Sequence, residues 1–141
     1  MPRFLVGASA AIFDENGRVL LFQHTYRRKY PWGMPGGWLK AGEDAAAAVV
    51  REVYEESGFQ VQAVRPLVIG GCKQEHRIDL IFLCTLQSGN FRPSDEVSEA
   101  RFFAPEELPA ILDPRHYNEI VQVLAQRDWP ESPLPDEVSG V

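Results

Sequence analysis

The stretch from Gly37 to Phe59 reads Gly-Trp-Leu-Lys-Ala-Gly-Glu-Asp-Ala-Ala-Ala-Ala-Val-Val-Arg-Glu-Val-Tyr-Glu-Glu-Ser-Gly-Phe, and most of it predicts one amphipathic helix. Asp44 is suited to begin that helix, because its carboxylate accepts a hydrogen bond from a free N–H of the first turn. Four alanines follow, and alanine has the highest helix propensity. Gly58 is suited to end it, since glycine readily adopts the left-handed backbone conformation. We therefore expect a helix over residues 45–57.

Three glutamates, Glu52, Glu55 and Glu56, fall within one turn of this helix. They lie beside an apolar arc formed by Ala46, Val49, Val50 and Val53. Like charges at these spacings lower the stability of a helix, whereas a bound divalent cation would reverse the sign of the interaction. Carboxylate oxygens are the ligands that Mg²⁺ and Mn²⁺ prefer. The alternative interpretation is a solvated acidic face, which is what most clusters of surface charge are.

Two neighbouring features favour the interpretation as a cation site. Arg51 lies beside the acidic face, four residues before Glu55, and is placed to orient that side chain. The segment before the helix, Met34-Pro35-Gly36-Gly37-Trp38, has a glycine pair directly after a proline, which indicates a special backbone conformation.

The spacing of the charged residues resembles the Nudix box of the Nudix hydrolases. The pattern is Gly37, five residues, Glu43, seven residues, Arg51-Glu52-Val53, one residue, Glu55-Glu56, one residue, Gly58 and an apolar residue. All seven fixed positions match, and the one departure is Phe59, where the family usually has an aliphatic residue. With each residue type at about 5–7% usage, such a match arises by chance about once in 10⁸ windows.

The resemblance implies a fold and a reaction. Nudix proteins are α+β, with a mixed β-sheet sandwiched between helices in an α/β/α arrangement. Nudix enzymes use Mg²⁺ or Mn²⁺ to hydrolyse a nucleoside diphosphate linked to another moiety. The metal ions would screen the charge of the pyrophosphate and lower the pKa of the attacking water. The implied substrate is a small-molecule nucleotide, with nucleoside triphosphates, nucleotide sugars and ADP-ribose all left open.

The resemblance also implies roles for particular residues. Glu55 and Glu56 are implied metal ligands, with the carbonyl of Gly37 or Gly36. Glu52 is a metal ligand or the general base, and Glu55 is the other candidate for the catalytic base. Many members add a glutamate from a loop after the sheet; here Glu96 is the first choice and Glu99 the second. Glu43 and Arg51 would hold the geometry of the loop and the helix behind the ligands.

A basic and aromatic loop over residues 24–33 leads into the glycine pair. Arg27, Arg28 or Lys29 would meet substrate phosphates, and Tyr26 or Trp32 would lie near a base or sugar. His76, in a later polar turn, is a candidate phosphate contact or proton carrier. The alternative is a solvated loop with Trp32 packed on the core.

The remaining elements are predicted from hydropathy and turn residues. Residues 4–13 predict a strand buried on both faces, paired through the Asn16-Gly17 turn with a strand over 19–23. Further expectations are strands over 61–64 and 67–70 split by Pro66, a polar turn over 71–77, a strand over 78–86, a long loop over 87–98, a strand over 99–103, a helical turn from Pro105 and a helix over 114–127.

Length predicts one domain, which by the resemblance is a Nudix domain over residues 1–129, and composition predicts a proline-rich tail over 130–141. The formal net charge of −6 argues against nonspecific binding to nucleic acid. There is no apolar run of 18 residues, so no membrane span is expected. The start lacks a signal-like stretch and the two cysteines, Cys72 and Cys84, lack metal-type spacing, which favours a cytoplasmic location. A homodimer is left open.

Two other functions fit the same resemblance. A catalytically silent Nudix-like module would bind or sense a nucleotide without cleaving it, but such a domain is expected to lose the carboxylate cluster, which is complete here. A diphosphate isomerase on this fold would depart from the box and need a catalytic cysteine, and neither cysteine lies next to the box.

Overall fold

The computed structural model describes residues 3–72 and 74–125. The strands are β1 (Leu5–Ala11), β2 (Val19–His24), β3 (Trp32–Gly33), β4 (Gly36–Trp38), β5 (Gln60–Cys72), β6 (Arg77–Ser88) and β7 (Val97–Phe103). The helices are α1 (Ala45–Ser57), a 3₁₀ turn (Pro105–Glu107), α2 (Leu108–Ile111) and α3 (Pro114–Ala125). The predicted tail, and residues 126 and 127 of the predicted last helix, lie outside the described residues.

Helix α1 begins and ends where the sequence predicts. Asp44 accepts a hydrogen bond from the N–H of Ala47 at 3.0 Å. Gly58 has a φ of 79° and donates its N–H to the carbonyl of Tyr54 at 2.8 Å. The predicted bounds and both caps are therefore confirmed. They could be predicted because each depends only on residues within one helical turn.

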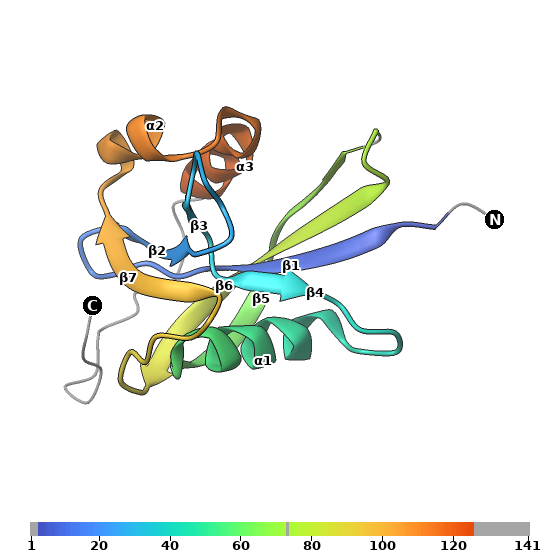
Figure 1. Ribbon diagram of the computed structural model, residues 1–141, viewed down its shortest axis with the longest axis horizontal. Helices are drawn as coiled ribbons and strands as arrows, with labels where there is room; N and C mark the ends of the chain where they lie inside the picture. Colours follow the sequence, from blue (N-terminus) through green and yellow to red (C-terminus); the bar gives the residue numbers. More distant parts are fainter. Residues whose placement is uncertain (1–2, 73, 126–141) are drawn as a thin grey trace.

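The strands form two sheets between helices. A four-stranded mixed sheet has the order β4-β1-β6-β5, with β1 and β6 parallel, and a three-stranded antiparallel sheet has the order β3-β2-β7. Helix α1 lies on one side of the strands and α2 and α3 lie on the other (Figure 1). The predicted α/β/α arrangement is therefore confirmed, with two sheets in place of one.

The predicted hairpin of the first two strands is wrong beyond its turn. Asp14 holds the turn by accepting hydrogen bonds from the N–H groups of Asn16 and Arg18, both at 2.9 Å. Only Phe13 and Val19 then pair as an isolated bridge. Strand β1 already has β4 on one side and β6 on the other, so it offers no edge to β2, and the chain crosses into the second sheet.

The predicted pair of short strands around Pro66 is one strand, β5, with register shifts near that proline. A proline has no N–H for the ladder, and β5 tolerates it because this strand is at the edge of the sheet. Strands β5 and β6 also extend into the predicted polar turn, leaving His76 in the connection with a φ of 49°. The predicted long loop is shorter, since β6 ends at Ser88 and β7 begins at Val97.

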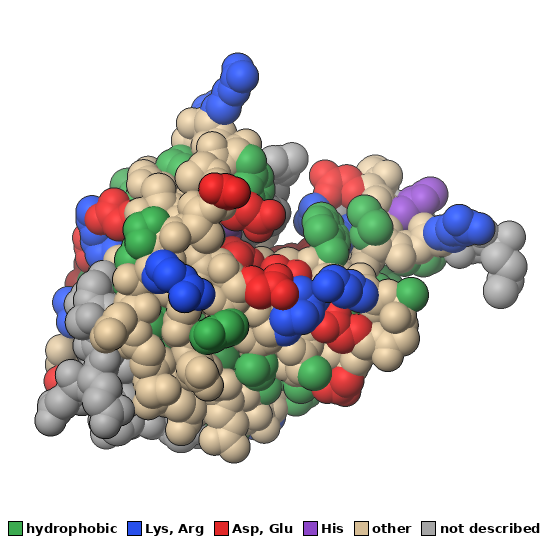
Figure 2. Space-filling view, turned by 60° about the horizontal axis from the view of Figure 1, so that its bottom comes forward, with side chains coloured by type: hydrophobic (Ala, Val, Ile, Leu, Met, Phe, Trp, Pro, Cys, Tyr) green, Lys and Arg blue, Asp and Glu red, His purple; other side chains and the backbone are tan. Residues whose placement is uncertain are grey.

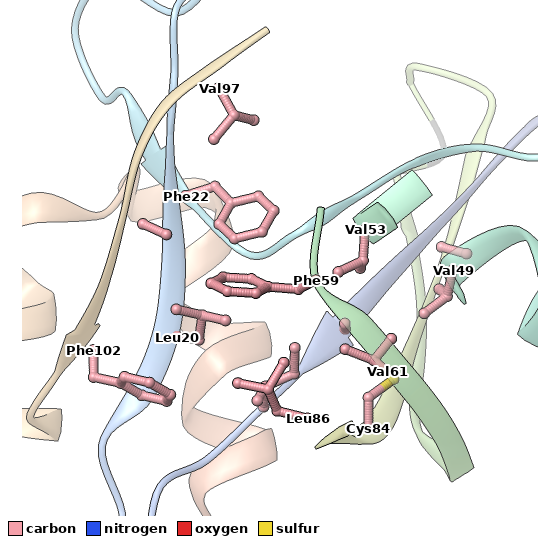
Figure 3. Packing of buried hydrophobic residues seen from close by; sticks show 14 residues of the cluster. Leu20, Phe22, Val49, Val53, Phe59, Val61, Cys84, Leu86, Val97 and Phe102 are labelled. Carbon is pink, nitrogen blue, oxygen red and sulfur yellow. The ribbon is translucent and has the colours of Figure 1, made fainter. Parts of the chain in front are cut away.

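One apolar cluster fastens α1 to both sheets. Phe59, which follows the helix, points toward Phe22 and Leu20 of β2, while Val53 reaches the cluster from α1 (Figure 3). A second cluster packs α2 and α3 on the opposite side. The first strand is buried only toward its C-terminal end, so the expected burial along both faces is wrong for its first residues.

Within residues 3–72 and 74–125, every helix is too short or too polar to span a membrane.

Candidate active site

The three glutamates of α1 have very different surroundings. The side chain of Glu55 is 55% exposed and that of Glu52 is 17% exposed, whereas only 4% of Glu56 is exposed. Glu56 belongs to the buried face of the helix together with Val49 and Val53. The helix therefore presents one carboxylate inward, one at the boundary and one to solvent.

Glu56 is a buried carboxyl group without a hydrogen-bond partner among the described residues. Burial raises its pKa to about 8, with further contributions from the charges of Glu52 and Glu96, and Arg27 acts in the opposite direction. An unpaired buried carboxylate is unfavourable, so burial favours the protonated form of this group.

The loop before β7 carries Glu96 to this carboxyl group and is anchored at two points. The hydroxyl of Ser94 donates to the carbonyl of Glu56 at 2.8 Å. On the other side, the N–H of Thr25 donates to the carbonyl of Glu96 at 2.9 Å, and its hydroxyl donates to Asp95 at 2.6 Å. Glu99, the second candidate from the sequence, instead lies on β7 in an ion pair with Arg101.

The glycine pair of β4 brings backbone against the acidic side chains. A Cβ on Gly37 would lie 2.6 Å from the carboxyl carbon of Glu52, which is closer than carbon atoms approach. A Cβ on Gly36 would lie 2.7 Å from the Cα of Ser9, and the φ of Gly36 is 155°. Only glycine fits at Gly36, where the added atom would meet backbone, whereas at Gly37 it would displace the Glu52 side chain. The absence of a side chain leaves the Gly37 backbone facing Glu52.

Arg51 joins the loop before α1 to the acids of the helix. Its Nε lies 2.7 Å and its Nη2 lies 2.8 Å from the two carboxylate oxygens of Glu43, a bidentate pair. Its Nη1 also lies 2.8 Å from Glu52 and 3.3 Å from Glu55. The hydrogen bond from Arg51, supported by the N–H of Lys40, lowers the pKa of Glu43 to about 2.

The side chains around Glu56 suit a hard divalent cation. The acids brought near one another are Glu52, Glu56 and Glu96, and carboxylate oxygen is the ligand that Mg²⁺ and Mn²⁺ prefer. Among the described residues, no group of three or more acidic, histidine or cysteine side chains is placed so that it could hold a metal ion. Arg51 contacts one oxygen of Glu52 and one of Glu55, and the second oxygen of Glu52 lies against Gly37 instead.

His24 is a site residue that the sequence analysis missed. It ends β2, is fully buried, and its Nε2 lies 3.8 Å from a carboxylate oxygen of Glu56. Burial, followed by the charge of Arg27, lowers its pKa to about 4, and its Nδ1 lies 3.2 Å from the carbonyl of Pro31. The sequence did contain a signal for this role, because His24 stands where the apolar strand ends and the basic loop begins.

A cavity of about 220 Å³ lies beside these acids. Of the predicted substrate residues, Arg27 and Trp32 line it, and Tyr26 does too. Trp32 also packs edge-on against Phe103, with ring centroids 4.9 Å apart.

Arg28 and His76 do not line this cavity. Arg28 is exposed in the basic loop, and His76 lies in the β5–β6 connection with its ring 5.7 Å from that of Phe4. The space-filling view shows acidic and basic side chains close together around a hollow between two parts of the molecule (Figure 2).

The α+β sandwich and the acidic helix that follows a glycine pair are features of a class of proteins. Comparison with known proteins identifies that class. Residues 3–126 match the NUDIX domain. The chain belongs to the Nudix family.

Several relatives carry names of hydrolases. The chain is 32% identical over 111 residues to the NAD-capped RNA hydrolase NudC of Vibrio parahaemolyticus, covering 78% of this chain and 42% of that protein. It is 28% identical to the ADP-ribose pyrophosphatase of Methanocaldococcus jannaschii, covering 71% of this chain and 62% of that protein. The chain thus spans well under two thirds of the first of these relatives.

A solved structure agrees over almost the whole length. The crystal structure of an ADP-ribose pyrophosphatase from Streptococcus suis superposes with a TM-score of 0.76 and 28% identity, covering 97% of this chain and 99% of that one. Nudix proteins generally use divalent metal ions.

Proposed function

We propose that this protein hydrolyses the pyrophosphate bond of a nucleoside diphosphate linked to a further moiety. The observation that carries the proposal is Glu56, a buried carboxyl group with no hydrogen-bond partner among the described residues and under the influence of Glu52 and Glu96. Glu52 in turn lies against the backbone of Gly37. A fold does not maintain such a group for stability, because an apolar side chain of the same size would cost less to bury.

The proposed cofactor is Mg²⁺ or Mn²⁺. Glu52, Glu56 and Glu96 would hold it with the carbonyl of Gly37, and Glu55 would complete the set from the solvent side. When bound, the cation supplies screening of the phosphate charge and a lower pKa for water. The chain's own part is to keep these carboxylates near one another, and the bidentate Glu43–Arg51 pair contributes by tying the loop before α1 to the helix.

The general base and the phosphate contacts are also assigned to residues at this site. Glu52 is the proposed general base, with Glu55 as the alternative, because both contact Arg51 at the edge of the hollow and are accessible to water. Arg27 lines the cavity close enough to Glu56 to affect its pKa, which suits it to a substrate phosphate. Arg28 lies further out on the same loop and would act on phosphates only from the rim.

The names of the relatives agree on one chemical feature of the substrate. ADP-ribose and an NAD cap both contain a nucleoside diphosphate joined to a second group. We take that feature as the proposed substrate class, with a free nucleotide preferred to a capped RNA because the chain carries a formal net charge of −6. Location in the cytoplasm and pairing into a homodimer stay predictions from the sequence.

The test is a product-release screen over a library of nucleoside diphosphate derivatives with Mg²⁺, Mn²⁺ or EDTA. We expect nucleoside monophosphate to be released from at least one compound with metal, and none with EDTA. Full turnover in EDTA would contradict the proposal. Tight nucleotide binding with no cleavage under any metal condition would instead support the catalytically silent module.

A further inference from the structure

One row of residues crosses the four-stranded sheet on the side away from α1. Trp38 of β4 pairs with Gly7 of β1, Gly7 pairs with Asp79 of β6, and Asp79 pairs with Gly70 of β5. Residues directly opposite one another in a sheet point to the same face. The row on the cavity side of the sheet is therefore an aromatic ring, a glycine without a side chain, a carboxylate and a second glycine.

Gly7 makes this row concave. A Cβ at Gly7 would lie 3.0 Å from Oδ1 of Asp79 and 3.5 Å from a ring carbon of Trp38. The carboxylate and the indole thus lean over the same point of β1. All three residues line the cavity of about 220 Å³.

Asp79 is held so that one oxygen faces this point. Its Oδ2 accepts a hydrogen bond from Nε of Arg77 at 2.8 Å, and Arg77 is itself paired with Glu75. The remaining oxygen, Oδ1, is the atom directed over Gly7. A carboxylate only accepts hydrogen bonds, so it selects a ligand that donates one there.

Trp38 supplies a flat surface beside that acceptor. Half of its side chain is exposed, although a tryptophan is normally well buried. Bases stack on exposed aromatic rings with little regard to sequence. A base lying on Trp38 would bring its edge to Asp79.

The row is continuous with the acidic hollow. Strand β4 is a three-residue edge strand, and Tyr26, Gly36, Gly37 and Trp38 line both the cavity and the hollow that contains Glu52 and Glu96. A ligand with its phosphates at the acids can therefore pass over β4 and reach Asp79.

A second acid lies at the far end of the row. Oε1 of Glu119, on α3, is 3.3 Å from the position of a Cβ on Gly70. Burial, and then the charge of Asp79, raise the pKa of Glu119. Arg77, which also lines the cavity, acts on Glu119 in the opposite direction. Because Asp79 and Glu119 together outweigh this one guanidinium, this end is unsuited to a phosphate and suited to a group rich in N–H donors.

We propose that the space over Gly7, between Trp38 and Asp79, is a subsite for a nucleobase that carries an exocyclic amino group. The proposal rests on the proposed function, since it assigns the nucleoside end of the same substrate. The base stacks on Trp38 and donates its amino hydrogen to Oδ1 of Asp79. The amino group is then what distinguishes a good substrate from a poor one.

The test is calorimetric binding of diphosphate pairs that differ only in the amino group, with Mg²⁺ present. The pairs are ADP against purine riboside diphosphate, and GDP against IDP. We expect the amino member of at least one pair to bind about tenfold more tightly, as a hydrogen bond to a charged group allows. Asp79→Asn should remove most of that difference.

Two further variants separate the roles. Trp38→Leu should weaken both members of a pair about tenfold and leave their ratio unchanged, because stacking does not read the amino group. Gly7→Ala should remove the discrimination by placing a methyl group at the subsite, which covers the case in which Asp79→Asn fails to fold. Glu15→Gln, in the turn after β1, is the control that removes one carboxylate elsewhere.

Equal binding within both pairs would overturn the subsite, and so would discrimination that survives both Asp79→Asn and Gly7→Ala. Absence of binding by all four nucleotides at millimolar concentration would overturn it as well. Binding needs no turnover, so a protein that discriminates the amino group but cleaves nothing would contradict the hydrolase proposal and retain the subsite.

Discussion

Glu43 and Glu56 belong to the same motif, yet the pKa values of their carboxyl groups are shifted in opposite directions. The hydrogen bonds from Arg51, then Lys40, lower the pKa of Glu43 to about 2, whereas burial raises that of Glu56 to about 8. The first group is hydrogen-bonded to a guanidinium, whereas the second has no hydrogen-bond partner among the described residues and lies 3.8 Å from His24, whose own pKa is lowered. A motif of like residues thus contains a fixed structural pair and a buried acid without such a partner.

The largest expected effect comes from Glu56→Gln, which keeps the shape of the side chain and removes its charge. Loss of one anionic ligand should cost about 4 kcal/mol of transition-state stabilisation, or about 10³-fold in turnover. The measurement is kcat at saturating Mg²⁺, with circular dichroism to verify the fold. Turnover within threefold of the parent would mean that Glu56 is only a buried acid.

The next effect tests whether the glycine backbone must approach the inner carboxylates. In Gly37→Ala the added methyl group would lie 2.6 Å from the carboxyl carbon of Glu52, so that side chain has to move. We expect about 10²-fold lower turnover and weaker metal binding, since small displacements of reacting groups cost this much.

Gly42→Ala is the control for inserting an alanine near the box. Gly42 has a φ of 77° but open space around its Cβ position, so this variant strains the backbone without touching Glu52. If both variants lost activity equally, backbone strain rather than contact with Glu52 would explain the effect.

Part of this comparison was visible in the sequence. The bounds of α1 and its caps follow from Asp44, the alanines and Gly58, which act within a single turn. The box spacing brought Glu43, Arg51 and the helix glutamates into one hypothesis. These features are local, and local features are what residue patterns predict best.

The remainder depends on contacts between distant segments. His24 lies near Glu56, and Asp79 and Trp38 flank Gly7, only because β1 is flanked by β4 and β6 while β2 belongs to the other sheet. Helical periodicity grouped Glu55 with Glu56, but packing on the sheets buried one and exposed the other. Sheet order and strand partners are nonlocal, so hydropathy along the chain does not determine them.

A third prediction uses the pH dependence of stability in EDTA. Folding raises the pKa of Glu56 from 4.5 to about 8, so the stability that its neutral form provides is lost as the pH rises through that window. Folding lowers the pKa of His24 from 6.5 to about 4, so stability is gained as the pH rises to 6.5 and is complete above it. The two slopes oppose each other below pH 6.5, and only that of Glu56 remains above.

Urea unfolding between pH 6.5 and 8 measures this remaining slope. The free energy of unfolding should fall by up to about 1.4 kcal/mol per pH unit relative to Glu56→Gln. Parallel curves for the two proteins would show that Glu56 titrates as an ordinary surface acid. Saturating Mg²⁺ should flatten the slope, because the cation takes the place of the proton.

The smallest effect is expected for Glu43, the acid that is held by Arg51. Glu43→Gln removes the charge that holds two nitrogens of Arg51 and leaves Arg51 free to shift toward Glu52 and Glu55. Because Glu43 acts through Arg51 rather than on the substrate, we expect about tenfold weaker Mg²⁺ activation with little change in turnover at saturating metal. The exposed Glu106→Gln is the matched control and should change neither quantity. A loss of turnover that high Mg²⁺ does not restore would place Glu43 among the catalytic groups, and the contrast with Glu56 would then be one of degree.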